Sequence, residues 1–134
     1  MLNVLLIEDS AADADIIAHY LAQALVSTAY EFVHCSTLTA GLVSSPKGPP
    51  HVVLLDLTLP DSTGVTTVER AQAALPGALI LVLTGATDRA LATSRLAAGA
   101  QDYMHKDDLD AATLRRAVLY GMGRFRSRTL RPTA

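Results

Sequence analysis

Polar residues of three chemical types stand at the ends of apolar segments in this 134-residue chain. They are Glu8, Asp9, Asp56, Thr84 and Lys106. Carboxylates that crowd together repel one another unless a cation neutralises them, and hard oxygen ligands suit Mg²⁺. A carboxylate held at such a metal can attack phosphorus, while a lysine and a hydroxyl bind the phosphoryl oxygens. The residue types therefore indicate phosphoryl transfer to a carboxylate.

Each of these residues also has a plainer interpretation as part of a polar loop. Glu8, Asp9 and Ser10 could cap the helix that follows them and interact favourably with its dipole. The whole set favours a site, because all its members stand at the carboxyl ends of four predicted strands. Ligands of open α/β sheets bind outside those ends.

The elements that would position these residues alternate along the chain. Short apolar, β-rich segments predict strands, and stretches of helical spacing between them predict helices. Because parallel neighbours need crossover connections, the alternation predicts an α/β fold: a doubly wound, five-stranded parallel sheet with five helices. The predicted strands are 3–7, 30–35, 51–55, 78–83 and 101–104, and the predicted helices are 11–26, 38–44, 64–74, 88–98 and 111–126.

The composition is that of one globular domain, with 50% hydrophobic and 18% charged residues. No apolar run approaches the roughly 18 residues that span a bilayer, and the start lacks the basic region of a signal peptide. The single cysteine, Cys35, cannot pair within the chain, which favours a cytoplasmic location. We expect one domain over residues 1–126, with 127–134 as a basic tail or the start of a linker.

Charge is distributed unevenly, although the net charge is only −2. All 13 acidic residues precede residue 111, whereas residues 111–134 hold arginines and no acid. These arginines could contact nucleic-acid phosphates, or they could favour the carboxyl end of the last helix and keep a linker soluble. With no aromatic residue among them beyond Phe125, we favour the second interpretation and expect no direct DNA binding. The arginines of the tail are Arg124, Arg126, Arg128 and Arg131.

Four strings of the sequence, in order and at family spacing, carry a resemblance to a known family. LLIEDS, LLDLTLPDSTG, LVLTG and GAQDYMHK resemble the receiver domain of bacterial response regulators, the family with a CheY-like fold. The resemblance covers roughly residues 2–126 and implies that Asp56 is the phosphoacceptor. It also implies that Asp9, Asp56 and the backbone carbonyl of Thr58 ligate Mg²⁺ directly. Glu8 would act on the metal mainly through water.

The resemblance further implies a switch. Thr84 would bind the phosphoryl group and move toward it, and Tyr103 would change rotamer as Thr84 shifts. Lys106 would pair first with Asp56 and then with the phosphoryl oxygens. These shifts would alter a surface made by the fourth helix, the fifth strand and the last helix. Its arginines are Arg89, Arg95, Arg115 and Arg116.

The partners implied by the resemblance are proteins. A histidine kinase or phosphotransfer protein would donate the phosphoryl group. The altered surface would bind a downstream target or fused output domain, or a second copy of the chain on activation. Such a domain assists only its own phosphorylation and dephosphorylation, so we do not expect this protein to be an enzyme. We also expect no membrane partner.

Two residues depart from the family pattern. Asp107 follows Lys106 where the family often has a proline joined by a cis peptide bond. A cis bond at a non-proline residue costs about 2.5–4 kcal/mol, so we expect a trans bond or a different loop. Gly85 follows Thr84 where alanine is common; it leaves room for the phosphoryl group but can loosen the loop.

Other functions fit less well. A flavodoxin-type FMN carrier must cradle a phosphate in its first loop, but residues 8–15 hold four carboxylates that would repel it. An aspartyl-nucleophile phosphatase needs a second carboxylate two residues after the first, where this chain has Thr58. A receiver-shaped interaction module that does not use phosphorylation stays open as the alternative. It should have lost part of the acidic pair, the acceptor or the lysine, and none is lost.

Overall fold

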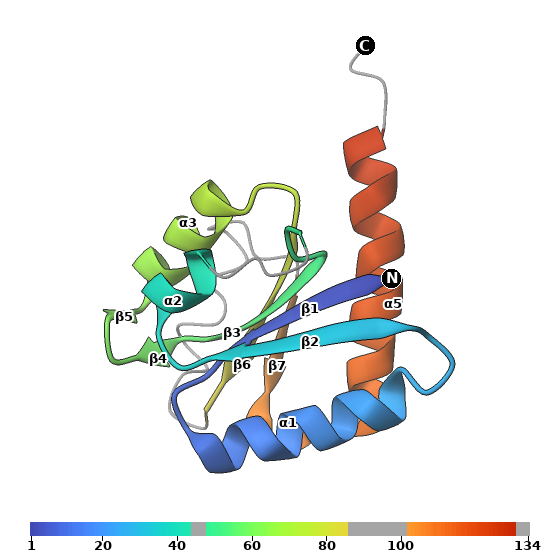
Figure 1. Ribbon diagram of the computed structural model, residues 1–134, viewed down its shortest axis with the longest axis horizontal. Coiled ribbons are helices and arrows are strands. Elements are labelled where there is room, and N and C mark those ends of the chain that lie inside the picture. The colour runs from blue at the N-terminus through green and yellow to red at the C-terminus, as the bar shows by residue number, and fades with distance from the viewer. Residues whose placement is uncertain (44–47, 86–101, 131–134) are drawn as a thin grey trace.

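A computed structural model describes residues 1–43, 48–85 and 102–130 (Figure 1). Five parallel strands form one sheet in the order β2-β1-β3-β6-β7. The predicted five-stranded parallel sheet is confirmed, with strand ends that differ by at most one residue. The strands are β1 (Leu2–Ile7), β2 (Tyr30–Cys35), β3 (Val52–Asp56), β6 (Leu79–Thr84) and β7 (Asp102–His105).

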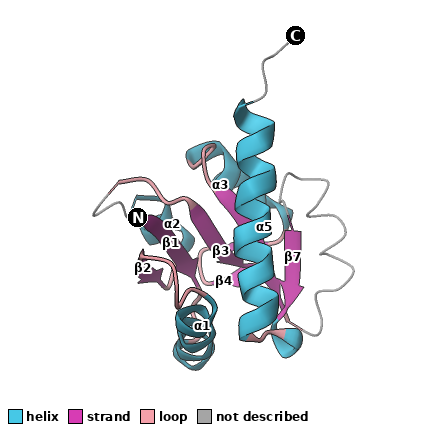
Figure 2. Ribbon diagram, turned by 90° about the vertical axis from the view of Figure 1, so that its right-hand side faces the viewer, coloured by secondary structure: helices cyan, strands magenta, loops and turns pink. Residues whose placement is uncertain are grey.

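Helices cover both faces of this sheet, which is why its central strands are continuous apolar runs. On one face, Val4, Leu6 and Leu54 belong to a core cluster that includes residues of α1 (Ala11–Ala24) and α5 (Ala111–Leu130). On the other face, residues such as Leu5 and Val53 form a second cluster with α2 (Leu38–Val43) and α3 (Val65–Ala74). Figure 2 shows α5 across the front of the sheet and α3 behind it.

The described helices begin within one residue of the predicted starts, and α1 ends at Ala24, two residues before its predicted end. α5 continues to Leu130, past the predicted end at residue 126, and Figure 1 shows it projecting beyond the sheet. The helix predicted over 88–98 lies outside the described residues.

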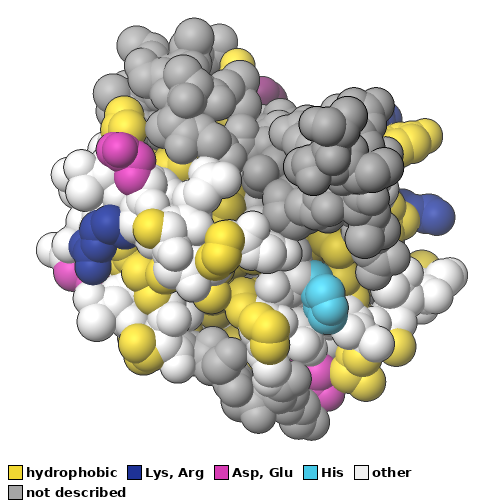
Figure 3. Space-filling model, turned by 90° about the horizontal axis from the view of Figure 1, so that it is seen from above, with side chains coloured by type: hydrophobic (Ala, Val, Ile, Leu, Met, Phe, Trp, Pro, Cys, Tyr) yellow, Lys and Arg dark blue, Asp and Glu magenta, His cyan; other side chains and the backbone are white. Residues whose placement is uncertain are grey.

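No helix within the described residues is both long and apolar enough to cross a membrane. Figure 3 views the end of the molecule away from α1, where apolar side chains gather and acidic ones are few and scattered.

The loop after β3 is tied to α2 by Asp61. This loop contains a small antiparallel pair, β4 (Thr58–Leu59) and β5 (Ser62–Thr63). The Asp61 carboxylate accepts hydrogen bonds from the backbone N–H groups of Leu38 and Thr39, both at 2.9 Å, and from the Thr39 hydroxyl at 2.8 Å. These N–H groups open α2 and have no partner within the helix, so Asp61 caps α2 from a distant loop.

Asp61→Asn should lower the urea midpoint at pH 7, because the amide nitrogen cannot accept those hydrogen bonds. The N–H groups of Thr39 and Leu38 lower the pKa of Asp61 to about 2 from its ordinary 3.8. Its contribution to stability is therefore complete above about pH 4 and is lost as the pH falls through about 2. Urea midpoints at pH 7 and pH 3 measure this change. Asp15→Asn, at an exposed position of α1, is the charge-matched control. Equal midpoints for Asp61→Asn and the control would contradict the capping role.

Candidate functional site

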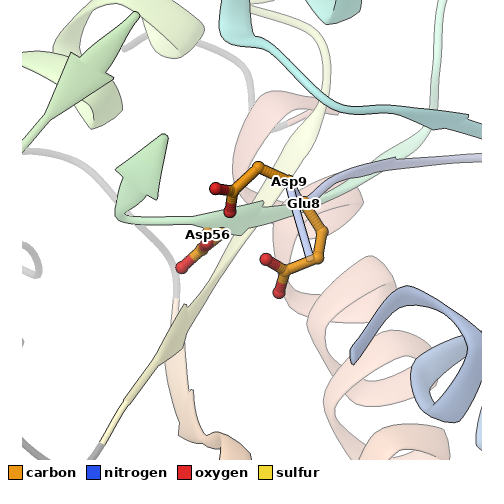
Figure 4. Close-up of side chains that lie close together, drawn as sticks. All are labelled: Glu8, Asp9 and Asp56. Atoms are coloured by element: carbon orange, nitrogen blue, oxygen red, sulfur yellow. The ribbon is translucent and has the colours of Figure 1, made fainter. Parts of the chain in front are cut away.

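Three carboxylates converge at the carboxyl ends of β1 and β3. One oxygen from each of Glu8, Asp9 and Asp56 lies within 4.8 Å of the others. Figure 4 shows the three carboxylates turned to the same side of the sheet edge. Glu8 and Asp56 are buried and Asp9 is exposed, so the cluster joins the protein interior to solvent.

Strand register brings Glu8 and Asp56 together. β1 and β3 are parallel neighbours in which Ile7 pairs with Leu55, so the next residues of the two strands meet at the sheet edge. One backbone and one side-chain hydrogen bond from β2 hold the Glu8 backbone in place: its N–H donates to the Cys35 carbonyl at 3.0 Å, and its carbonyl accepts from His34 Nε2 at 2.7 Å. The position of Glu8 therefore follows from the sheet.

Lys106 lies among these carboxylates, directly after β7 and at the start of a short 3₁₀ turn (Lys106–Asp108). Its ammonium is 2.6 Å from Glu8 Oε1, 3.1 Å from Asp13 Oδ2 and 3.6 Å from Asp56 Oδ1. The resemblance implies a pair between Lys106 and Asp56; these two groups are within ion-pair distance, and Glu8 is the nearer partner of the lysine. Asp13 is one of the four acids in residues 8–15, and its position four residues after Asp9, one helical turn along, is the sequence signal for its place beside the site.

Burial and mutual repulsion change the acidity of the cluster. Burial, followed by the adjacent Glu8, raises the pKa of Asp56 to about 7, because an ionised Asp56 adds a second buried negative charge. The positive charge of Lys106 lowers the pKa of Asp56 and so opposes these two effects. For Lys106, burial disfavours the ammonium, but Glu8, Asp56 and Asp13 outweigh it and raise the lysine pKa above its usual value. A cation at the carboxylates would favour the ionised form of Asp56.

The two predicted switch residues lie on strands next to the cluster. Thr84 ends β6, is fully buried, and donates its hydroxyl to the Met104 carbonyl at 3.4 Å. Tyr103 on β7 is 40% exposed. Thr58 follows Asp56 closely, and its N–H donates to Asp56 Oδ1 at 3.4 Å. Of the four predicted surface arginines, Arg115 and Arg116 are exposed on α5, and Arg89 and Arg95 lie outside the described residues.

The peptide bond between Lys106 and Asp107 is trans, as expected from the missing proline. The loop instead turns through the 3₁₀ segment, in which the Asp107 N–H donates to His105 Nδ1 at 3.3 Å. His105 thus caps this turn.

The donor set fits Mg²⁺. Three carboxylates offer hard oxygen ligands within a few ångströms, one of them is exposed to solvent, and a small octahedral cation keeps several waters. Burial and Glu8 raise the pKa of Asp56 although Lys106 lowers it, and a bound cation would lower it further.

Comparisons with known proteins agree with this geometry. A family model described as the response regulator receiver domain matches residues 4–119. The photosynthetic apparatus regulatory protein RegA of Rhodovulum sulfidophilum is 35% identical over 98 residues, which are 70% of this chain and 54% of RegA. The KDP operon transcriptional regulatory protein KdpE of Escherichia coli is 32% identical over 108 residues, 79% of this chain and 45% of KdpE. The chain thus spans about half the length of these relatives.

Solved structures share the fold. A CheY-like response regulator receiver domain protein from Methanospirillum hungatei superposes with a TM-score of 0.78 at 23% identity, over 96% of this chain and 98% of that one. A response regulator receiver domain protein from Clostridium thermocellum gives 0.79 at 22% identity, over 98% of this chain and 100% of that one. The doubly wound fold expected from the sequence is therefore confirmed.

Asp56→Asn should flatten the pH dependence of stability in metal-free protein. Because the pKa of folded Asp56 is raised from 3.8 to about 7, the folded state binds a proton that the unfolded state has lost between those values. Stability from this group therefore falls as the pH rises from about 4 to about 7. In urea unfolding in EDTA at pH 5, 6, 7 and 8, the urea midpoint of the variant should rise relative to that of the wild type as the pH increases.

Mg²⁺ provides the second arm of this measurement. At pH 8 it should raise the urea midpoint of the wild type more than that of Asp56→Asn. Parallel pH curves for the two proteins in EDTA would contradict the raised pKa of Asp56.

Proposed function

This chain belongs to the response regulator receiver domain family of two-component signalling, and we propose that it accepts a phosphoryl group on Asp56 with the help of Mg²⁺. The observation that carries the proposal is the convergence of Glu8, Asp9 and Asp56 with the Lys106 ammonium at one sheet edge. Carboxylates and a lysine in this arrangement combine a nucleophile, metal ligands and a fixed positive charge.

In the proposed site, Asp9, Asp56 and the Thr58 backbone carbonyl would hold Mg²⁺, with Glu8 acting mainly through water. Bound Mg²⁺ would neutralise the carboxylates and offset charge on the phosphoryl group during transfer. With the cation present, Asp56 is held in its ionised form, which is the form that can attack phosphorus. Buried Glu8 keeps the surrounding field negative and so favours cation binding.

During transfer, an Asp56 oxygen would attack phosphorus while the bond from phosphorus to the donor's histidine nitrogen breaks. The histidine leaves with the electron pair of that bond. Lys106 and the Thr84 hydroxyl would bind the phosphoryl oxygens, which requires Thr84 to release its hydrogen bond to the Met104 carbonyl. That release is the proposed first step of the switch.

The proposed switch carries this change to the protein surface. Thr84 is opposite His105 in the pairing of β6 with β7. A shift of Thr84 would therefore displace β7, the strand that carries Tyr103. Tyr103 would turn inward, altering the face that includes Arg115 and Arg116 of α5. A downstream protein, a fused output domain or a second copy of the chain would read that face.

We further propose that the receiver unit covers residues 1–126 and acts in the cytoplasm. It would receive its phosphoryl group from a histidine kinase or phosphotransfer protein and act on no outside substrate. α5 runs continuously past residue 126, so the proposed boundary with the basic tail (127–134) falls within a helix.

Titration with beryllofluoride and Mg²⁺, followed by amide NMR, tests the function. The complex mimics the phosphoryl group at Asp56, so shifts should cluster at Asp9, Asp56, Thr84 and Lys106 and spread to Tyr103. Asp56→Asn should show no such shifts and should not take up phosphoryl groups from acetyl phosphate.

The outcome separates the parts of the proposal. Normal phosphoryl uptake by Asp56→Asn would exclude Asp56 as the acceptor. Shifts at the site that never reach Tyr103 or α5 would exclude the switch. A folded wild type with no Mg²⁺-dependent change would favour a phosphorylation-independent interaction module.

A further inference from the structure

Lys106 is shared between carboxylates of two different kinds. Glu8 is fully buried and lies 2.6 Å from the ammonium, whereas Asp13 lies 3.1 Å away with 42% of its side chain exposed. Asp56 Oδ1, at 3.6 Å, is beyond ordinary hydrogen-bond distance. The ammonium therefore lies closer to Glu8 and Asp13 than to the proposed acceptor.

The placement of Asp13 follows from α1 and from the pleat of the sheet. Ser10 caps α1 by accepting the Asp13 N–H at 3.2 Å, which fixes Asp13 in the first turn. Met104 on β7 belongs to the core cluster on the α1 side, and the 3₁₀ turn after β7 begins at Lys106, whose ammonium reaches Asp13 Oδ2 at 3.1 Å. Asp13 thus meets Lys106 because of where two regular elements end.

We infer that Asp13 is a positioning residue, which holds the Lys106 ammonium on the α1 side and competes with the phosphoryl group for it. This inference rests on the proposed function. A phosphoryl oxygen that recruits Lys106 must replace one of its present partners. The ammonium gives up Asp13 more readily than Glu8, because an exposed carboxylate regains water whereas a buried one would be left unpaired.

Asp13→Asn should therefore bind beryllofluoride about two- to fivefold more tightly than the wild type at saturating Mg²⁺, the range expected for loss of a partly exposed ion pair. Asp13→Glu, which keeps the carboxylate, should stay near the wild-type affinity. Asp15→Asn removes the same charge from an exposed position two residues along α1 and should have little effect. Affinities are measured by amide NMR titration, with thermal unfolding to confirm that each variant is folded.

A double-mutant cycle separates positioning from a general charge effect. In a Lys106→Gln background, the gain from Asp13→Asn should vanish, since no ammonium remains to be released. The ¹⁵N resonance of Lys106 Nζ gives an independent measure: in free protein it should differ from the wild type in Asp13→Asn and not in Asp15→Asn.

Three results would overturn the positioning role while leaving the proposed function intact. They are equal affinities for Asp13→Asn and Asp15→Asn, weaker binding by Asp13→Asn, and a gain that survives without Lys106. If Lys106→Gln binds too weakly to measure, an unchanged Lys106 Nζ resonance in Asp13→Asn overturns it. A wild type that shows no Mg²⁺-dependent response to beryllofluoride would instead remove the proposed function, and the inference with it.

Discussion

Two buried carboxylates, Glu8 and Asp56, face one ammonium, that of Lys106, among the described residues, and the rest of the site depends on this imbalance of charge. Isolated buried charges are costly, so such a cluster persists only where a rigid scaffold holds its members in place. Here the scaffold is a sheet packed on both faces by apolar clusters, with register that fixes Glu8 beside Asp56. The apolar layers stabilise the fold, and the excess negative charge leaves the site receptive to a cation.

The apolar layers are also what made the fold predictable. β1, β3 and β6 are buried on both faces, so they stand out in the sequence as continuous apolar runs between turn residues. Their ends were less predictable: Asp56 and Thr84 still belong to strands, because the hydrogen-bond ladder continues past the last apolar residue. The extension of α5 to Leu130 was missed because it carries no apolar period, although arginine favours helix.

The members of the site could be named from the sequence, but their contacts could not. The predicted strand ends place Glu8, Asp9, Asp56 and Lys106 at one edge of the sheet. This prediction needs only the residue types and the rule that the carboxyl ends of parallel strands lie at the same edge. Which carboxylate lies nearest to the Lys106 ammonium depends on where α1 begins relative to β7. No local sequence pattern encodes that relation. The bonds from Asp61 to Thr39 and Leu38 were hidden for a similar reason, since 22 and 23 residues separate the partners.

The Asp61 cap also restricts how the loop after Asp56 can vary in length. Asp61 must reach the first turn of α2 while Gly64 (φ 79°, ψ −160°), in a conformation open almost only to glycine, turns the chain into α3. A one-residue insertion or deletion between Asp56 and Asp61 would leave β3 intact yet move the carboxylate away from α2. The spacing of LPDSTG is therefore set by geometry as much as by residue chemistry, and natural variants of this loop should change by substitution rather than by length.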